Sequence, residues 1–425
     1  MKIIIWMLAL IPTTATTVFG ANLTVTSSLL SSYASQTNIV LQATGDVIFD
    51  GGPLNPAALP PGASTGRLTI QAGNDIVIRN NTSITAAPGW SVFFLAGNTI
   101  TLDSGSGIGA DAGRITLNAK VVNQNGLIQA NSVRDQNGVI ELVVSDSLNL
   151  GAASRILSRG DNSVSGSAGG TVTLKSGNNF SDTVGSAIVT AGGANGGNGG
   201  NIEISAPNVL SLNSGMDAGA QPGWNSGIFA LDPVNIVLGN SGSTSGGTSG
   251  TIQGTNGSGT LSVNVNSAFQ NINAGQILLE ASGNITLDTG TTWDLYASTG
   301  NKTSGQLTLE AGGNIIFADY SSISDANSWS VTIDAGYNFT GNSIQPGVGN
   351  IYLNGGLAGD GIGGSIQTAS GSINLEAGGG IQIGSGSVSS TAGDVKWYAS
   401  GDILFGDGSQ ITDGSGAVTL NAGYS

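Results

Sequence analysis

The sequence contains no cysteine and no histidine, and only 9% of its residues are charged. Without cysteine there can be no disulfide, thiolate ligand or cysteine nucleophile, and without histidine the imidazole ligands and the commonest general base are missing. The 11 lysines and arginines are scattered against 26 acidic residues, and the net charge of −15 repels nucleic acid and anionic lipid. We therefore expect no catalytic residue, no metal, no cofactor and no nucleic-acid partner.

Glycine is what the sequence has in excess. The 70 glycines among 425 residues are more than twice the ordinary usage. The chain is nevertheless 39% hydrophobic, and its aliphatic residues are spread evenly between glycine and asparagine turns, which is not the pattern of a disordered protein. A large buried core is therefore expected.

The N-terminus reads MKIIIWMLALIPTTATTVFG, one lysine followed by an apolar run. This pattern predicts a secretory signal peptide over residues 1–20 with cleavage after Gly20, and an uncleaved anchor is the alternative. No later segment is apolar for long enough to span a bilayer. We expect a secreted or cell-surface protein without stable membrane insertion.

Nearly the same nine letters recur along the chain. LEAGGNIIF from Leu309 has close copies at Leu41, Leu279, Leu375 and Trp397. Within it, Leu309, Ala311, Ile315 and Phe317 alternate with outward positions, as in short strands, and the glycines and asparagine between them favour a sharp bend. Each copy therefore predicts a strand, a corner and another strand.

Alignment of the corners places one apolar residue of each repeat in a common inward position. Neighbouring positions are separated by roughly 22 to 30 residues, which is the length of one turn of a parallel β-helix. The sequence therefore predicts an all-β, right-handed parallel β-solenoid in which these residues stack: Leu41, Ile70, Phe94, Leu279, Leu309, Ile333, Leu375 and Trp397.

A longer repeat is superimposed on the short one. The segment from Leu23 matches the segment from Leu261 at an offset of 238 in residue number, and Trp90 meets Trp329 at 239. GRITLN from Gly113 is matched with GNIYLN from Gly349. We expect two tandem modules of about 238 residues, one over residues 21–221 and one over residues 222–425 that is incomplete at its C-terminus. The break inside a coil predicts a longer natural protein and self-association through the last coil.

The strands ILLEASGNITL and GQLTLEAGGNIIF, the segment SLLSSYASQTNIVLQA and the passage PGWNSGIFALDPVNIVLG from Pro222 resemble filamentous-haemagglutinin-like, haemagglutinin-repeat adhesins of Gram-negative bacteria. The resemblance covers nearly the whole chain after residue 20. It implies export by two-partner secretion or an autotransporter-like route, with an outer-membrane transporter as partner. The family's Asn-Pro-Asn secretion motifs are represented here only by Asn55-Pro56.

One tripeptide is a candidate ligand contact. Arg159, Gly160 and Asp161 spell the sequence that some adhesins present to integrins, although coincidence is the simpler interpretation in a glycine-rich chain. Arg155 and Arg159 near Asp161 are also compatible with a polysaccharide lyase, because such enzymes share the β-helix fold.

Three acidic residues form a second candidate. Glu280, Glu310 and Asp334 occupy the same outward position on successive repeats. An acidic ladder could bind a divalent cation, and the alternative is a solvated face on which each like-charge pair costs about 1 kcal/mol. GGANGGNGGN from Gly192 is interpreted as a glycine-rich loop.

Together these features favour a surface adhesin or structural stalk, not an enzyme, with a host-cell, glycan or matrix ligand that the sequence does not identify. The first alternative is a β-helix lyase or hydrolase acting on acidic glycans, which would need several carboxylates and a basic residue to converge in a groove. The second is a component of a biofilm matrix or surface layer.

Overall fold

The structure is a computed structural model that describes residues 14–33, 36–54, 65–240, 253–255, 259–355, 363–385, 387–390 and 392–424. Asn55-Pro56 and positions 1–13 of the expected signal peptide lie outside these ranges. The described residues are nearly all β and form long parallel sheets, as an all-β parallel solenoid requires. They divide into two compact units, residues 1–202 with 217–226, and residues 203–216 with 227–425.

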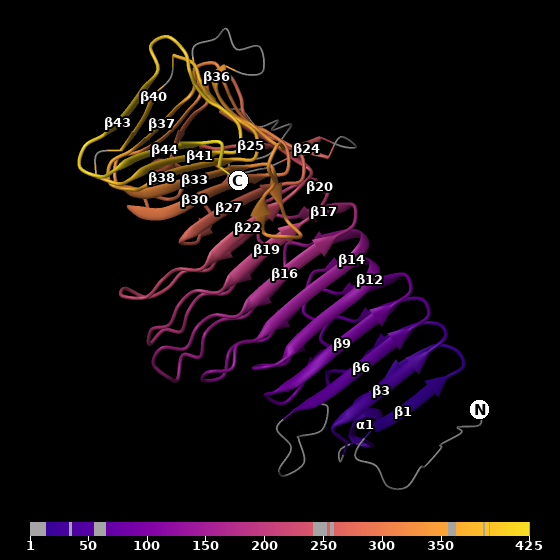
Figure 1. Ribbon diagram of the computed structural model, residues 1–425. Coiled ribbons are helices and arrows are strands. Elements are labelled where there is room, and N and C mark those ends of the chain that lie inside the picture. The colour runs from indigo at the N-terminus through magenta and orange to yellow at the C-terminus, as the bar shows by residue number, and fades with distance from the viewer. Residues whose placement is uncertain are drawn as a thin grey trace. The chain divides into compact units, whose positions relative to one another are not determined.

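In the first unit each coil contributes strands to three parallel faces (Figure 1). The first face contains β1 (Thr14–Phe19), β3 (Asn38–Ala43), β6 (Gly66–Ala72), β9 (Trp90–Ala96), β12 (Arg114–Gln124), β14 (Val139–Leu150) and β16 (Thr171–Ser176). The second contains β2 (Leu23–Val25), β4 (Val47–Phe49), β7 (Ile76–Ile78), β10 (Thr99–Leu102), the later residues of β12 and β14, and β17 (Asn179–Asp182). The third contains β5 (Pro53–Leu54), β8 (Ser83–Thr85), β11 (Gly107–Gly109), β13 (Leu127–Gln129), β15 (Arg155–Leu157) and β18 (Ala187–Val189).

The second unit repeats this arrangement. Its first face contains β22 (Ile228–Asp232), β27 (Gln276–Ala281), β30 (Ser304–Ala311), β33 (Ser328–Ala335), β38 (Ile373–Ala377), β41 (Val395–Ala399) and β44 (Val418–Ala422). Its second contains β23 (Asn235–Gly239), β24 (Gln253–Thr255), β25 (Thr260–Asn264), β28 (Ile285–Leu287), β31 (Ile315–Ala318), β36 (Ile351–Gly355), β39 (Ile381–Ile383) and β42 (Ile403–Phe405). Its third contains β29 (Thr292–Asp294), β32 (Ser322–Asp325), β37 (Ser365–Thr368), β40 (Ser387–Ser390) and β43 (Gln410–Asp413).

The remaining elements are short. They are α1 (Ser27–Ser31), α2 (Leu295–Ser298), β19 (Asn201–Ser205), β20 (Asn208–Val209), β21 (Gly215–Asp217), β26 (Ile272–Asn273), and the strands β34 (Tyr337–Asn338) and β35 (Ser343–Ile344). Among the described residues no helix is long and apolar enough to cross a membrane. Strand β1 lies within the expected signal peptide, yet it pairs in register with β3 from Thr14 to Phe19.

The expected stacking of apolar residues is confirmed. In the first unit Leu41 pairs with Ile70 and Ile70 with Phe94. In the second unit the pairing runs without a gap through Leu279, Leu309, Ile333, Leu375 and Trp397. All of these side chains are fully buried. The core of each unit is therefore a set of in-register apolar columns.

The corners between first and second faces are held by asparagine side chains. The Oδ1 atom of Asn284 accepts a hydrogen bond from the backbone N–H of Asn314 at 2.7 Å, and Oδ1 of Asn314 accepts one from Asn350 at 2.8 Å. Oδ1 of Asn350 accepts in turn from Gly380 at 2.7 Å. Each asparagine thus satisfies a backbone donor of the following coil, which explains why this residue recurs at the bends.

Replacing Asn314 with alanine is expected to lower the free energy of unfolding of the second unit by about 1 to 2 kcal/mol, because the N–H of Asn350 loses its acceptor. Asn314→Asp keeps the acceptor oxygen and is the matched control. Chemical denaturation of the three proteins measures the difference, and an alanine variant as stable as the wild type would contradict the role given to the ladder.

A glycine lies against a tryptophan in both units. Gly66 pairs with Trp90 and Gly305 with Trp329, and a Cβ atom on either glycine would come within 2.3 and 2.7 Å of the indole, respectively. Only glycine leaves room for the ring at these positions. The two glycines, like the two tryptophans, are offset by 239 in residue number, so the repeat seen in the sequence extends to a packing detail that the sequence match did not include.

Two expectations fail at the level of single strands. GRITLN belongs to β12 on a first face, whereas GNIYLN belongs to β36 and pairs with β31 and β39 on a second face, so these segments are not equivalent. Thr308, outward by alternation, is only 3% exposed, because the side-chain amides of Gln276 and Gln306 both donate to its hydroxyl.

The mismatch has a visible cause in an insertion after β33. Strands β34 and β35 form an antiparallel hairpin within residues 336–349, before the second face resumes at β36. Gly336 and Gly349 close the base of this insertion with φ of 76° and 72°, and a Cβ on Gly349 would lie 2.1 Å from the nitrogen of Gly336. The added segment shifts every later residue number of the second unit relative to the first.

The last described coil leaves its apolar residues uncovered. Leu420 pairs with Trp397 and continues the same column, but it is 45% exposed. Leu404, Phe405 and Tyr424 are exposed to a similar degree. Self-association through this coil stays a prediction.

Candidate functional site

The tripeptide Arg159-Gly160-Asp161 lies in a loop that follows β15. Arg159 is exposed, Gly160 is buried and Asp161 is partly exposed. A Cβ on Gly160 would lie 2.3 Å from both the nitrogen of Gly193 and the carbonyl oxygen of Ser167. The glycine is therefore explained by packing between neighbouring loops.

The carboxylate of Asp161 is committed to its own surroundings. Oδ1 accepts hydrogen bonds from the hydroxyl and the N–H of Ser163, at 2.6 and 2.8 Å, and Oδ2 accepts from the N–H of Arg134 at 3.1 Å. These hydrogen bonds hold the pKa of Asp161 below its ordinary value, and the bond from the Ser163 hydroxyl has the largest effect. The residue organises the loop, and a receptor would have to replace these contacts.

Arg155 is similarly occupied. Its Nη1 donates to the carbonyl oxygens of Ser154 and Gly185 at 2.7 and 2.6 Å, and so ties two adjacent coils together. A lyase would need Arg155 and Asp161 to converge on a substrate. The contacts of the two side chains do not support such an arrangement.

The expected acidic ladder is present and is longer than expected. Glu280 pairs with Glu310, Glu310 with Asp334, and Asp334 with Glu376, all on the outward side of the first face. Asp232, directly after the Leu231 that pairs with Leu279, continues it in the other direction. We refer to these five residues as the acidic column. Figure 1 shows four of its strands, β27, β30, β33 and β38, side by side.

The carboxylates of the acidic column disfavour each other's ionisation. Adjacent strands are about 4.8 Å apart, so in-register carboxylates repel. Partial burial raises the pKa of Glu280 to about 7, and the negative charges of Asp232, Glu310 and Glu203 contribute to a smaller extent. Burial, with Glu310 and Glu376, raises the pKa of Asp334 to about 7 as well.

Two further members of the column, Glu310 and Glu376, follow the same trend. Burial raises the pKa of Glu310 and of Glu376. Tyr337, from the β34–β35 insertion, has a raised pKa through burial and through the charges of Glu310, Asp334 and Glu280, so this ring lies near the column. The ion pairs found among the described residues join Arg79 to Asp50, Arg114 to Glu141 and Lys396 to Asp394, and none involves Glu280, Glu310, Asp334 or Glu376.

The geometry does not favour the cation site that the sequence offered as one interpretation. Within the described ranges no group of three or more acidic side chains is arranged to hold a metal ion. A single file of carboxylates along parallel strands binds protons more readily than it surrounds a cation. The chemical property it provides is proton uptake near neutral pH.

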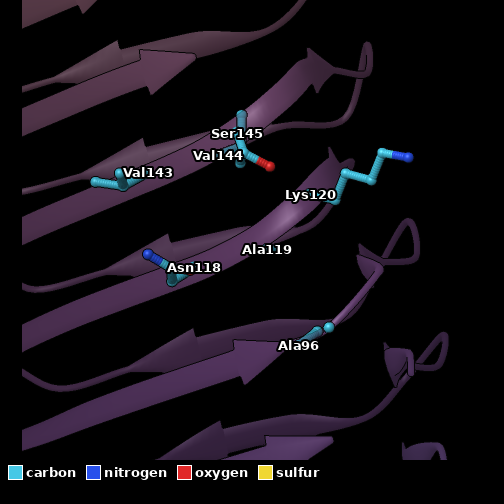
Figure 2. A pocket seen from close by; sticks show the side chains of 8 residues that line it. Ala96, Asn118, Ala119, Lys120, Val143, Val144 and Ser145 are labelled. Atoms are coloured by element: carbon cyan, nitrogen blue, oxygen red, sulfur yellow. The ribbon is translucent and has the colours of Figure 1, made fainter. Parts of the chain in front are cut away.

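The corresponding outward position of the first unit is not acidic. It is occupied by Gln42, Gln71, Leu95, Asn118, Val143 and Lys175. Beside it, the corners of successive coils form shallow open depressions. One, of about 420 Å³, is lined by Ala96, Gly97, Asn118, Ala119, Lys120, Val143, Val144 and Ser145 (Figure 2). Apart from Lys120, which extends away from Asn118 and Val143 in this view, the lining residues are uncharged.

A second depression of about 500 Å³ lies at the same corner of earlier coils and is lined by Val18, Gln42, Ala43, Thr44, Gln71, Ala72 and Gly73. The two depressions are alike because each is floored by the alanine of the repeated motif. They are surface features of the repeat and not a converging active site. The outward position that borders these depressions corresponds to the position of the acidic column in the second unit.

No protein-family model matches the chain, and neither a curated protein nor a solved structure shows significant similarity to it.

Proposed function

We propose that the protein is a secreted or cell-surface adhesin or structural stalk, built as a right-handed parallel β-solenoid from two tandem modules. One observation carries this proposal. Buried apolar columns run in register through each unit, and the outward face of the same strands carries polar and charged side chains that vary between units. Such a scaffold displays surface without needing a cleft.

The contacts of the candidate residues support a binding role over a catalytic one. Asp161 and Arg155 are used in loop structure, and none of the ion pairs among the described residues joins a basic side chain to Glu280, Glu310 or Asp334. General acid–base cleavage of a glycan needs a carboxylate or basic group free to reach the bond. The signal peptide over residues 1–20 and an outer-membrane transporter complete the proposed route to the surface.

Beads coated with the purified chain are expected to adhere to cultured epithelial cells or to surfaces carrying glycans or matrix proteins, at least tenfold above albumin-coated beads. Retention under flow measures the effect. Beads coated with heat-denatured chain are the matched control, because they carry the same sequence without the folded surface.

Two results would contradict the proposal. Cleavage of an acidic polysaccharide by the purified chain, lost in Asp161→Asn, would establish the lyase alternative. Absence of adhesion to every surface, together with recovery of the protein in the extracellular matrix of the producing cells, would establish the matrix alternative.

A further inference from the structure

Four loops of the first unit lie on successive coils and contact one another. They are residues 131–137, 159–168, 191–199 and 219–226, which we call the loop cluster. The N–H of Ser132 donates to the carbonyl of Arg159 at 2.7 Å, that of Gly160 to Ala191 at 2.8 Å, and that of Gly192 to Gly219 at 2.9 Å. The parallel ladder of the solenoid thus extends into the loops and gives them a fixed relative position.

Trp224 is the exceptional side chain of this cluster. Trp90, Trp293, Trp329 and Trp397 are fully buried, whereas Trp224 is 44% exposed. Its indole lies against the backbone of two other loops, because a Cβ on Gly196 would be 2.4 Å from Nε1 and a Cβ on Gly166 would be 3.1 Å from Cη2. Both glycines have positive φ, 98° and 80°. The ring is therefore seated on glycine backbone while much of it remains in solvent.

The loops that contact the indole, and the loop that carries it, also contain amide side chains. Asn162, Asn195, Asn198 and Asn225 are all exposed. Several of them also fix the loops: Oδ1 of Asn162 accepts from the N–H of Ala194 at 2.7 Å, and Oδ1 of Asn198 accepts from that of Asn225 at 3.0 Å. An exposed ring on loops that also carry amides presents one apolar surface and many hydrogen-bonding atoms.

Two guanidinium groups belong to the same cluster. Arg134 and Arg159 are exposed, and the ion pairs of the described residues involve other cations. Arg134 has a φ of 53°, which is unfavourable for a residue with a side chain, and its N–H bond to Asp161 holds it there. Asp135 and Asp161 lie in the same loops, so the cluster carries two cations and two carboxylates, and the carboxylate of Asp161 is engaged by Ser163 and Arg134.

We propose that the loop cluster binds a glycan containing uronic acid, with a sugar ring stacked on Trp224, hydroxyl groups bonded by the asparagine amides and a carboxylate held by Arg134 or Arg159. The proposal rests on the adhesin function proposed above and names its ligand class. The C–H face of a pyranose is apolar and its rim is hydroxylated, which matches an exposed indole on loops that carry amides. Guanidinium groups match planar carboxylates with two parallel hydrogen bonds.

The surroundings of Trp224 distinguish this ligand from other partners. A peptide or a membrane would bury the indole among further apolar side chains, whereas the contacts of this ring are with the backbone of Gly166 and Gly196. Three coil steps of about 4.8 Å separate the first loop from the last, so the cluster spans roughly 15 Å and is suited to an oligosaccharide.

The test is calorimetric titration of the full chain with three probes, namely oligogalacturonate, alginate oligosaccharide and hyaluronan oligosaccharide, and with a neutral glucan of equal length. We expect at least one uronic-acid probe to bind at least tenfold more tightly than the glucan. Trp224→Ala is expected to weaken that binding at least tenfold, and Arg134→Gln combined with Arg159→Gln to weaken it to a similar extent. Tyr320→Ala, which removes another exposed aromatic ring, and Arg79→Gln are the matched controls and should bind as the wild type does.

Fluorescence gives a second readout that does not depend on affinity. A bound sugar ring should change the emission of Trp224, and Trp224→Phe should lose that change while circular dichroism shows an unaltered fold. Binding of none of the three probes, equal binding by Trp224→Ala, or equally tight binding of the neutral glucan would each overturn the inference. Poly-glutamate binding with the same dependence on Trp224 would overturn the assignment to glycans.

The bead assay separates this inference from the proposed function. Adhesion that is unchanged in Trp224→Ala would overturn the glycan site and leave the adhesin proposal standing. Glycan binding in solution without adhesion of coated beads would overturn the adhesin proposal and leave the site standing.

Discussion

Replacing Leu309 with aspartate is expected to lower the free energy of unfolding of the second unit by about 4 kcal/mol or more. Leu309 is fully buried between Leu279 and Ile333 in an apolar column, where no polar partner can reach a carboxylate. The aspartate must either stay protonated at neutral pH or disrupt the coil, and both outcomes cost free energy. Thermal unfolding followed by circular dichroism measures the loss.

The matched control is Thr286→Asp. Thr286 alternates with the buried Ile285 and Leu287 and faces outward, partly exposed. The same new charge should cost about 1 kcal/mol or less there, because it remains in contact with water. Hydrogen exchange should show that the damage from Leu309→Asp is concentrated in β27, β30 and β33, since each coil contacts mainly its neighbours. Equal melting temperatures for the two variants would disprove the inside and outside assignment.

Lowering the pH from 8 to 5 is expected to raise the melting temperature of the second unit. Folding raises the pKa of Glu280 and of Asp334 to about 7, from ordinary values of 4.5 and 3.8. Between those values and 7 the folded state binds more protons than the unfolded state, so stability increases as the pH falls through 7 and is lost again above it. The gain should be on the order of 2 kcal/mol after allowance for partial exposure, which corresponds to roughly 4 to 8 °C.

The variant Glu280→Gln with Asp334→Asn is the control for this pH dependence. It removes two charges from the acidic column, so the protein should be more stable at pH 8 and its melting temperature should change little between pH 8 and pH 5. Asp161 and Asp394 have lowered pKa values and favour folding at higher pH, but they titrate below this window. A wild-type melting temperature that falls on acidification from pH 8 to pH 5 would contradict the electrostatic account.

The columns of the core could be predicted from the sequence because a solenoid repeats one physical requirement. The inward position before each corner alanine must be apolar, and the register of Leu279, Leu309, Ile333 and Leu375 follows from aligning similar letters. The asparagine at each bend was equally visible. The reason for the asparagine is a hydrogen bond to the next coil, which only the three-dimensional structure shows.

What the sequence missed depends on contacts between residues far apart in the chain. Thr308 is buried by Gln276, which lies 32 residues away, and simple alternation takes no account of such a neighbour. The hairpin of β34 and β35 interrupts the repeat, so an alignment of the two halves by similar letters falls out of step after β33. Glu376 could have been found, because it precedes Ala377 as Glu310 precedes Ala311. The seat of Trp224 on Gly166 and Gly196 carried no signal in the local sequence.

The in-register pairing of β27, β30 and β33 has a consequence for how such a gene changes length. Leu279 pairs with Leu309, and Leu309 pairs with Ile333, so each coil presents nearly the same edge to whatever coil follows. Unequal recombination between the gene segments that encode LEASGN from Leu279 and LEAGGN from Leu309 would delete or duplicate one whole turn of the solenoid. After such a change each remaining strand still has a compatible neighbour to pair with. Descendants of one gene can therefore differ in their number of turns without passing through an unfolded ancestor.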